Sequence, residues 1–217
     1  MEKSNKYAIV GENGAGKTTL VKILLGLLDY EGSILINGIE LREISKNCLS
    51  KHFGAIFQDF VKYEMTVSEN IGFENNKNID EIIRKVGFNK KIDSFENGKN
   101  QFLGKLEEGI SLSLGEWQKI ALARLLIRNC DCLIFDEPTA SLDPISEREI
   151  IENINHLITE DNIGIWITHR LGSCRSCDYI LVLKDGKIVE NDTFNNLLNF
   201  ESYFKKLYTT QRSWYNE

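Results

Sequence analysis

Proline is scarce in this sequence, and no apolar run is long enough to cross a membrane. The 217 residues include two prolines, Pro138 and Pro144, so a long flexible joint between domains is not expected. No stretch approaches the ~18 consecutive apolar residues of a transmembrane helix. The polar segment 1–6 has no apolar core of the kind found in secretion signals. We therefore expect neither a membrane span nor a signal peptide in this chain.

Basic residues are fewer than acidic residues in this sequence. The number of cysteines is odd. Lys and Arg number 26 against 32 Asp and Glu, which gives a net charge of −6. Such a chain repels nucleic-acid phosphates as a whole, so no nucleic-acid partner is expected. Five cysteines without a secretion signal indicate reduced thiols. Cys174-x-x-Cys177 has metal or redox spacing but no second pair, which favours an incidental pair over either role.

Apolar runs that alternate with helix-like periods predict an α/β protein. A content of 42% apolar residues can bury a real core. We expect a parallel sheet with helices on both faces, and a mostly helical insertion at 60–128 between core segments 1–59 and 129–217. Capping-box patterns begin helices at Thr66 and Ser113, and Ser146 is expected to begin another. The predicted strands are 7–10, 33–36, 53–57, 132–135, 163–167, 179–183 and 187–190, and the other predicted helices are 17–28, 194–199 and 201–209.

The strongest local pattern is a glycine-rich loop between a strand and a helix. It reads Gly11-Glu12-Asn13-Gly14-Ala15-Gly16-Lys17-Thr18 and fits G-x-x-x-x-G-K-[ST]. Glycines let backbone N–H groups wrap around phosphates, and the helix that follows adds its positive end. We expect Lys17 to reach the β- and γ-phosphates, Thr18 to bind Mg²⁺ and Thr19 to reach an earlier phosphate.

A second pattern places two acids at the end of an apolar strand. The run Cys132-Leu133-Ile134-Phe135 is followed by Asp136 and Glu137. Paired carboxylates have no packing reason to end a buried strand, because unpaired buried charge is costly. An exposed acidic strand end is the alternative. Beside the glycine loop, we expect Asp136 to face Mg²⁺ and Glu137 to act as general base toward the attacking water.

With further motifs in order, the sequence resembles the nucleotide-binding domain of ATP-binding-cassette (ABC) transporters from about Lys6 to the end. Gln58 resembles the Q-loop, and Ser141-Leu142-Asp143 the D-loop. Leu112-Ser113-Leu114-Gly115-Glu116 resembles the family signature, and Thr168-His169 the switch histidine. The resemblance implies the fold of a P-loop NTPase with ATP and Mg²⁺ as ligands.

The resemblance also implies residue roles. Gln58 would sense Mg²⁺ and the attacking water, and His169 would orient the γ-phosphate and that water. Two cassettes would dimerise head to tail, with Ser113 and Gly115 on the ATP of the partner and Asp143 reaching toward the opposite glycine loop. Leu114 and Glu116 depart from the usual glycine and glutamine of the signature. They add bulk and negative charge beside the phosphate path.

The start of the sequence also departs from the family. Members usually carry further strands and an adenine-stacking aromatic before the glycine loop, which here begins at residue 11. Tyr7 is expected to pack in the core rather than stack on adenine. A fragment, a mis-assigned start, or another way of holding the base would each explain this. We expect weaker ATP binding than in an N-terminally extended version, and an unpaired sheet edge.

The segments around Gln58, Ser113 and His169 look most like the exporter branch. That likeness implies a Mg²⁺-dependent ATPase that powers export of a peptide, lipid or drug-like substrate. Its partners would be a second, identical cassette and transmembrane domains, at the cytoplasmic face of the membrane. Two alternatives remain: a soluble, non-transport ABC ATPase, and a nucleotide-binding regulator with weak turnover.

Overall fold

A computed structural model describes residues 1–72, 78–104, 109–139 and 144–213. The chain divides into two compact units. The first comprises residues 1–55, 131–137 and 158–217, and the second residues 56–130 and 138–157. Residues 138–157 were expected in the core, and they group instead with the helical unit. A single domain with a core at 1–59 and 129–217 remains a prediction.

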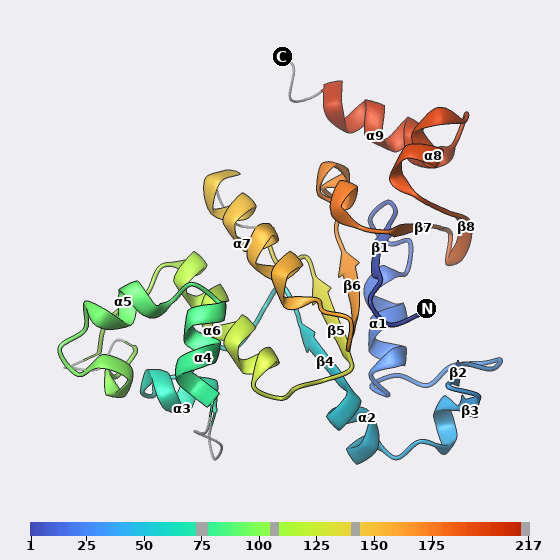
Figure 1. The fold of residues 1–217 in the computed structure, drawn as a ribbon. Coiled ribbons are helices and arrows are strands. Elements are labelled where there is room, and N and C mark those ends of the chain that lie inside the picture. Colours follow the sequence, from blue (N-terminus) through green and yellow to red (C-terminus); the bar gives the residue numbers. More distant parts are fainter. Residues whose placement is uncertain (73–77, 105–108, 140–143, 214–217) are drawn as a thin grey trace. The chain divides into compact units, whose positions relative to one another are not determined.

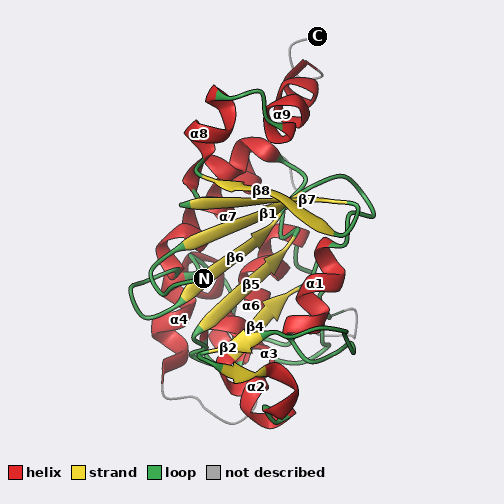
Figure 2. Ribbon diagram, turned by 90° about the vertical axis from the view of Figure 1, so that its right-hand side faces the viewer, coloured by secondary structure: helices red, strands yellow, loops and turns green. Residues whose placement is uncertain are grey.

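The first unit is built on a six-stranded sheet with the order β4-β5-β6-β1-β7-β8. Strand β1 is central, and its Ile9 pairs with Ile167 on one side and Leu181 on the other, both in parallel register (Figures 1 and 2). Among the pairings described within this sheet, only that of β7 with β8 is antiparallel. The strands are β1 (Lys6–Val10), β4 (Phe53–Ile56), β5 (Cys132–Asp136), β6 (Ile163–Ile167), β7 (Tyr179–Lys184) and β8 (Lys187–Asp192). The predicted parallel α/β class is confirmed.

Apolar sequence explains why these strands form the centre. All five residues of β5 are buried, as are the last four of β1 and of β6. Such continuous burial is typical of a parallel sheet covered on both faces. Tyr7 packs here as expected, with its ring centroid 5.7 Å from that of Tyr179.

The helices of the first unit are short. They are α1 (Lys17–Leu24), α2 (Lys46–His52), α8 (Phe194–Asn199) and α9 (Tyr203–Ser213), with 3₁₀ turns η1 (Leu41–Glu43) and η4 (Leu171–Ser176). The predicted helix 17–28 ends early because Gly26 adopts φ 68° and closes the helix with a bond from its N–H to the carbonyl of Ile23. Helix α2 was not expected from the sequence. Ser45 caps it by accepting from the N–H of Cys48 at 3.2 Å.

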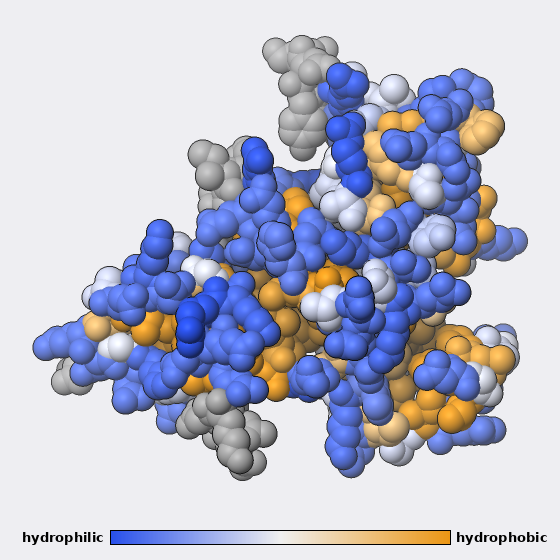
Figure 3. Space-filling model, in the orientation of Figure 1, coloured by the Kyte–Doolittle hydropathy of each residue, from blue (hydrophilic) through white to orange (hydrophobic). Residues whose placement is uncertain are grey.

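A small antiparallel hairpin stands apart from the main sheet. Strands β2 (Leu35–Ile36) and β3 (Ile39–Glu40) pair only with each other among the pairings described. Leu35 is 63% exposed and Ile39 is 52% exposed. Figure 3 shows apolar surface gathered over this hairpin. Exposed apolar area of this kind is typical of a surface that another element covers.

The second unit is helical and is organised around α6 (Leu114–Leu126). Trp117, Ile120, Ala121, Leu122 and Leu125 of this helix are buried. The other helices are α3 (Val67–Ile71), α4 (Ile79–Lys85), α5 (Asn89–Asp93) and α7 (Pro144–Leu157), with the 3₁₀ turn η3 (Gly98–Asn100). Both predicted capping boxes, at Thr66 and Ser113, are confirmed. In the part of the chain that the structure describes, no helix combines the length and apolarity needed to cross a membrane.

Candidate functional site

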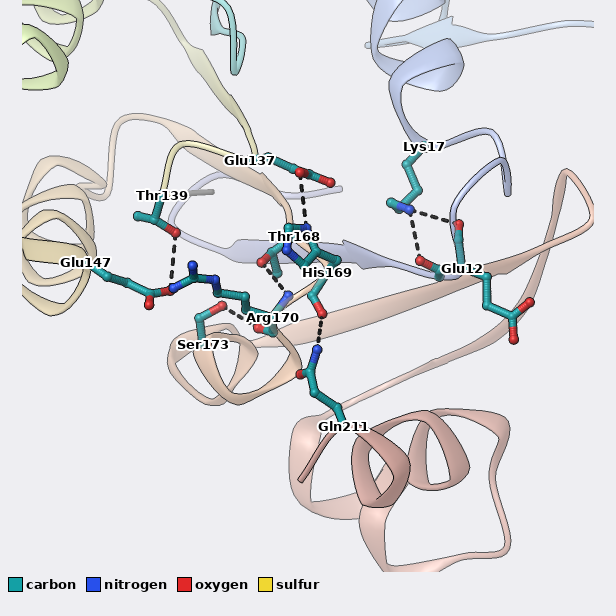
Figure 4. A network of polar contacts seen from close by, with 11 residues as sticks. Glu12, Lys17, Glu137, Thr139, Glu147, Thr168, His169, Arg170, Ser173 and Gln211 are labelled. Atoms are coloured by element: carbon teal, nitrogen blue, oxygen red, sulfur yellow. Dashed lines mark hydrogen bonds and ion pairs between the residues drawn. The ribbon is translucent and has the colours of Figure 1, made fainter. Parts of the chain in front are cut away.

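The site lies at the carboxyl ends of parallel strands in the first unit. The glycine loop follows β1, Glu137 follows β5, and Thr168 and His169 follow β6. Parallel strands that pair in register end at the same edge of a sheet, which is where α/β proteins bind ligands. Figure 4 shows Lys17, Glu137 and His169 gathered there.

The glycine loop is shaped by close backbone packing. Gly11 has φ 153°, and a Cβ there would lie 2.2 Å from the carbonyl oxygen of Leu183. No other residue fits that position. Gly16 has φ 99° and precedes α1 without a side-chain cap, and the first turn of α1 has no acidic residue. The positive end of α1 is therefore left for an anionic ligand.

Lys17 is held inside this loop. Its Nζ donates to the carbonyl oxygens of Gly11 at 2.8 Å and Glu12 at 3.0 Å (Figure 4). The residue is 7% exposed. Burial lowers the pKa of Lys17 from its usual value, and the charges of Glu137 and Asp136 oppose that shift. Two acids therefore stabilise a desolvated ammonium at the position where a phosphate would bind.

Asp136 closes the site from β5. It is 5% exposed, and burial raises its pKa above the usual range, although a hydrogen bond from Thr18 opposes the shift. Glu137 raises this pKa further, and Lys17 lowers it. A buried carboxylate next to a hydroxyl offers hard oxygen ligands to a cation such as Mg²⁺, which also removes the cost of burying the charge. The residues present therefore fit that ion.

Glu137 adopts an unusual backbone conformation. Its φ is +51°, in the left-handed region that residues with a side chain rarely adopt. Its N–H donates to the carbonyl of Ile167 at 2.9 Å, which ties the turn to β6. The carboxylate Oε2 lies 3.1 Å from Nδ1 of His169. Backbone strain of this kind gathers at functional sites because it aims a side chain.

The signature segment begins α6 in the second unit. Ser113 accepts from the N–H of Glu116 at 3.2 Å, and the Glu116 carboxylate accepts from the N–H of Ser113 at 2.8 Å. Nζ of Lys91 lies 2.9 Å from Glu116. Partial burial disfavours the charge of Glu116, but the bonds from Lys91 and Ser113 outweigh it and lower its pKa. The extra acid of this signature is therefore used in capping and ion pairing.

The remaining expected residues lie as follows. Gln58 is exposed just after β4, and Gly115 lies in the first turn of α6. Asn13, Gly14, Ala15 and Thr19 lie in or next to the glycine loop. Asp143 of the expected D-loop falls outside the described residues.

Cys174 and Cys177 are buried free thiols, and burial raises the pKa of Cys177 to about 12. Burial raises the pKa of Cys174 as well, which disfavours the reactive thiolate in both.

Comparison with known proteins decides the family. The family model described as ABC transporter matches residues 1–140. The chain belongs to the ABC transporter family. A solved ABC exporter of the bacterial Atm1 family, with ATP bound, superposes with a TM-score of 0.86 at 30% identity, over 96% of this chain and 37% of that one. The predicted ABC ATPase fold is thereby confirmed, and the chain is an ATP-binding domain of this family.

Two transport proteins are similar over almost the whole cassette. The subtilin transport ATP-binding protein SpaT of Bacillus subtilis is 42% identical over 95% of this chain and 35% of its own length. The nisin transport ATP-binding protein NisT of Lactococcus lactis subsp. lactis is 40% identical over 97% of this chain and 36% of its own. The chain thus spans about a third of the length of these relatives.

Proposed function

We propose that this chain is the ATP-hydrolysing motor domain of an ABC exporter. One observation carries the proposal. A buried lysine, a buried aspartate bonded by a threonine hydroxyl, and a glutamate paired with a histidine meet where β1, β5 and β6 end. A packing role explains none of these five side chains, whereas triphosphate hydrolysis requires each of them.

The loop between β1 and α1 binds the phosphates. The backbone N–H groups of residues 11–16 surround the phosphates, and Lys17 exchanges its two carbonyl partners for β- and γ-phosphate oxygens. Thr19 reaches a phosphate nearer the nucleoside. Thr18 and Asp136 would hold Mg²⁺, and the family resemblance gives Gln58 as a further ligand. Mg²⁺ bound there would neutralise charge that develops on the phosphate oxygens.

Glu137 activates the attacking water. Its carboxylate takes a proton from water that attacks the γ-phosphorus in line with the leaving oxygen. His169, whose Nδ1 lies 3.1 Å from that carboxylate, orients the γ-phosphate and the water. The family resemblance gives Gln58, which lies just after β4, the role of sensing the same water.

Completion of the site requires a second cassette. Ser113 and Gly115 present the N-terminal end of α6, which binds the γ-phosphate of ATP held by a partner copy. The family resemblance gives Asp143 a role toward the opposite glycine loop. ATP closes this head-to-tail homodimer, and hydrolysis reopens it.

Transport would require partner membrane domains, and the names of similar proteins support a role in transport. SpaT and NisT are named for transport of subtilin and nisin, and a 34% identical relative from Blochmanniella floridana is named an ATP-dependent lipid A-core flippase. We propose a peptide or lipid-like cargo and a position on the cytoplasmic face of the membrane. A soluble, non-transport ATPase gains no support from these relatives.

Glu137→Gln tests the function. Phosphate release with ATP and Mg²⁺ should fall at least ~100-fold, the usual contribution of a general base. ATP binding should persist, and ATP-bound dimers should accumulate on size-exclusion chromatography. The matched control is Glu160→Gln, which changes an exposed carboxylate before the opposite end of β6 and should leave hydrolysis unchanged. Equal rates in parent and Glu137→Gln would remove Glu137 from the role of base.

A further inference from the structure

Helix α9 reaches the loop that carries His169, although 42 residues separate the two in sequence. Gln211 uses both ends of its side-chain amide. Nε2 donates to the carbonyl of His169 at 2.6 Å, and Oε1 accepts from the N–H of Leu171 at 2.8 Å. Figure 4 shows this contact below the His169 ring. One amide thus pairs with the backbone on both sides of Arg170, as a neighbouring strand would.

Other bonds hold the neighbouring backbone groups of this loop. The N–H of Thr168 donates to the carbonyl of Ile9 at 3.4 Å, and the N–H of Arg170 donates to the hydroxyl of Thr168 at 2.9 Å. Ser173 donates to the carbonyl of Arg170 at 2.7 Å. The Gln211 amide adds the two bonds that fix the backbone at His169 and Leu171. The direction of the imidazole follows from that backbone.

Helix α9 is itself well anchored. Phe204 is fully buried, with its ring centroid 5.6 Å from that of Phe194. The Glu190 carboxylate accepts from the N–H groups of Tyr203 and Phe204, which caps the start of the helix. Gln211 follows Tyr203 by eight residues, about 12 Å along the axis. The amide is therefore presented by an ordered element.

The first residue of α9 contacts the other loop of the site. The carboxylate of Glu12 in the glycine loop raises the pKa of Tyr203 to about 12, so the two side chains lie close together. Nζ of Lys184 lies 4.7 Å from the centre of the Tyr203 ring. One helix thus contacts both the loop that leads to Lys17 and the loop of His169.

We propose that Gln211 is a positioning residue for ATP hydrolysis. It holds the backbone at His169, and this backbone sets the 3.1 Å contact between Nδ1 and Glu137 Oε2. The inference rests on the proposed function, because it assigns His169 a part in the reaction. A misplacement of about 1 Å at such a group can cost up to ~100-fold in rate. Binding by Lys17 and the glycine loop does not depend on these two bonds.

The test replaces the amide and keeps the helix. Gln211→Met retains a long, helix-forming side chain and loses both bonds. We expect kcat to fall about tenfold with KM for ATP unchanged. The loss of two hydrogen bonds should lower the melting temperature by no more than about ten degrees. The control is Thr210→Ala on the next residue, where the lost hydroxyl bonds only to the carbonyl of Lys206 among the described contacts. This variant should keep the parent kcat.

A second readout does not require turnover. The amide of Leu171 should exchange with solvent faster in Gln211→Met than in the parent, and the NMR signals of the His169 imidazole should shift. If the parent itself hydrolyses no ATP, the proposed function fails. The exchange rate of the Leu171 amide and the NMR signals of the His169 imidazole then still test whether Gln211 positions this loop.

Three results would overturn the inference. They are an unchanged kcat, a rise in KM equal to the loss in kcat, and imidazole signals that stay at the parent position. Should Gln211→Met not fold, Gln211→Ala takes its place, with the same outcomes.

Discussion

The glycine loop of the first unit and the signature segment of the second both lead into a helix, but the two helices begin differently. Gly16 precedes α1 with no side-chain cap and no acid in the first turn. Ser113 precedes α6 with a complete capping box, whose Glu116 also pairs with Lys91. The free N–H groups at the start of α1 leave it dependent on a bound anion. The start of α6 is largely satisfied within its own unit.

Burial follows the same division. Lys17 and Asp136 are buried with shifted pKa values, whereas Ser113 is exposed. Buried, desolvated charges act strongly on a ligand because little water screens them. We infer that the first unit supplies most of the ATP affinity of one chain. The signature helix then contributes when a second copy brings a phosphate to it.

The largest expected effect comes from removing the buried ammonium. Lys17→Ala should weaken ATP binding at least ~30-fold, which is about 2 kcal/mol and within the range for a charge-assisted hydrogen bond. Titration calorimetry with ATP and Mg²⁺ measures this directly. The comparison predicts that no single change at the start of α6 has as large an effect on binding to one chain.

Lys22→Ala provides the control for charge alone. Lys22 is exposed on the same helix, so its loss removes one positive charge from α1 without touching the loop. ATP affinity should change less than about threefold at 0.15 M salt, because screening weakens exposed charges. If both variants lose affinity equally, the overall charge of α1 accounts for binding and the buried contact does not.

The glycine loop and both capping boxes were predictable because each is written in consecutive residues. The residue types fix the local backbone, and the structure follows them at Gly11, Gly16, Thr66 and Ser113. The acids of β5 were predictable for a related reason. An apolar run that ends in two carboxylates contradicts packing unless another group meets them.

Contacts that join distant segments were beyond the sequence. Nothing near Gln211 announces that its amide pairs with the backbone 42 residues earlier, because the contact depends on how α9 packs through Phe204. Tyr203 and Glu12 are a second example. The early end of α1 depended on Gly26 adopting a positive φ, which the helical spacing of its leucines concealed. Short elements such as α2 lack the length for a clear period.

A smaller effect separates the signature from an ordinary capped helix. Ser113→Ala and Thr66→Ala each remove one capping bond in the second unit, and each should cost about 1 kcal/mol of unfolding free energy. Only Ser113→Ala should slow ATP hydrolysis, by about fivefold or more, because only α6 is proposed to meet the ATP of a partner copy. Urea unfolding and phosphate release measure the two effects. Equal rates in the two variants would make Ser113 a structural cap alone.

The smallest expected effect concerns the stability of the first unit. Burial raises the pKa of Asp136 above 3.8, so between that value and the folded pKa the folded chain binds more protons than the unfolded chain. Its contribution to stability is fully present below pH 3.8 and is lost as the pH rises through the folded pKa. Asp136→Asn removes this titration. At pH 7 the free energy of unfolding of the variant should be about 0.5 kcal/mol higher than that of the parent, because the variant no longer buries a charged carboxylate.

Acid should erase that difference. Below pH 3.8 the parent carries a neutral carboxylic acid of nearly the same shape as the amide, so urea unfolding curves of the two proteins should converge. Asp161→Asn, an exposed change before β6, should track the parent at both pH values. If Asp136→Asn is more stable than the parent by the same amount below pH 3.8 as at pH 7, the charge of Asp136 is not what destabilises the site. The first unit would then hold its buried acid at no cost, and the contrast with the self-satisfied start of α6 would rest on capping alone.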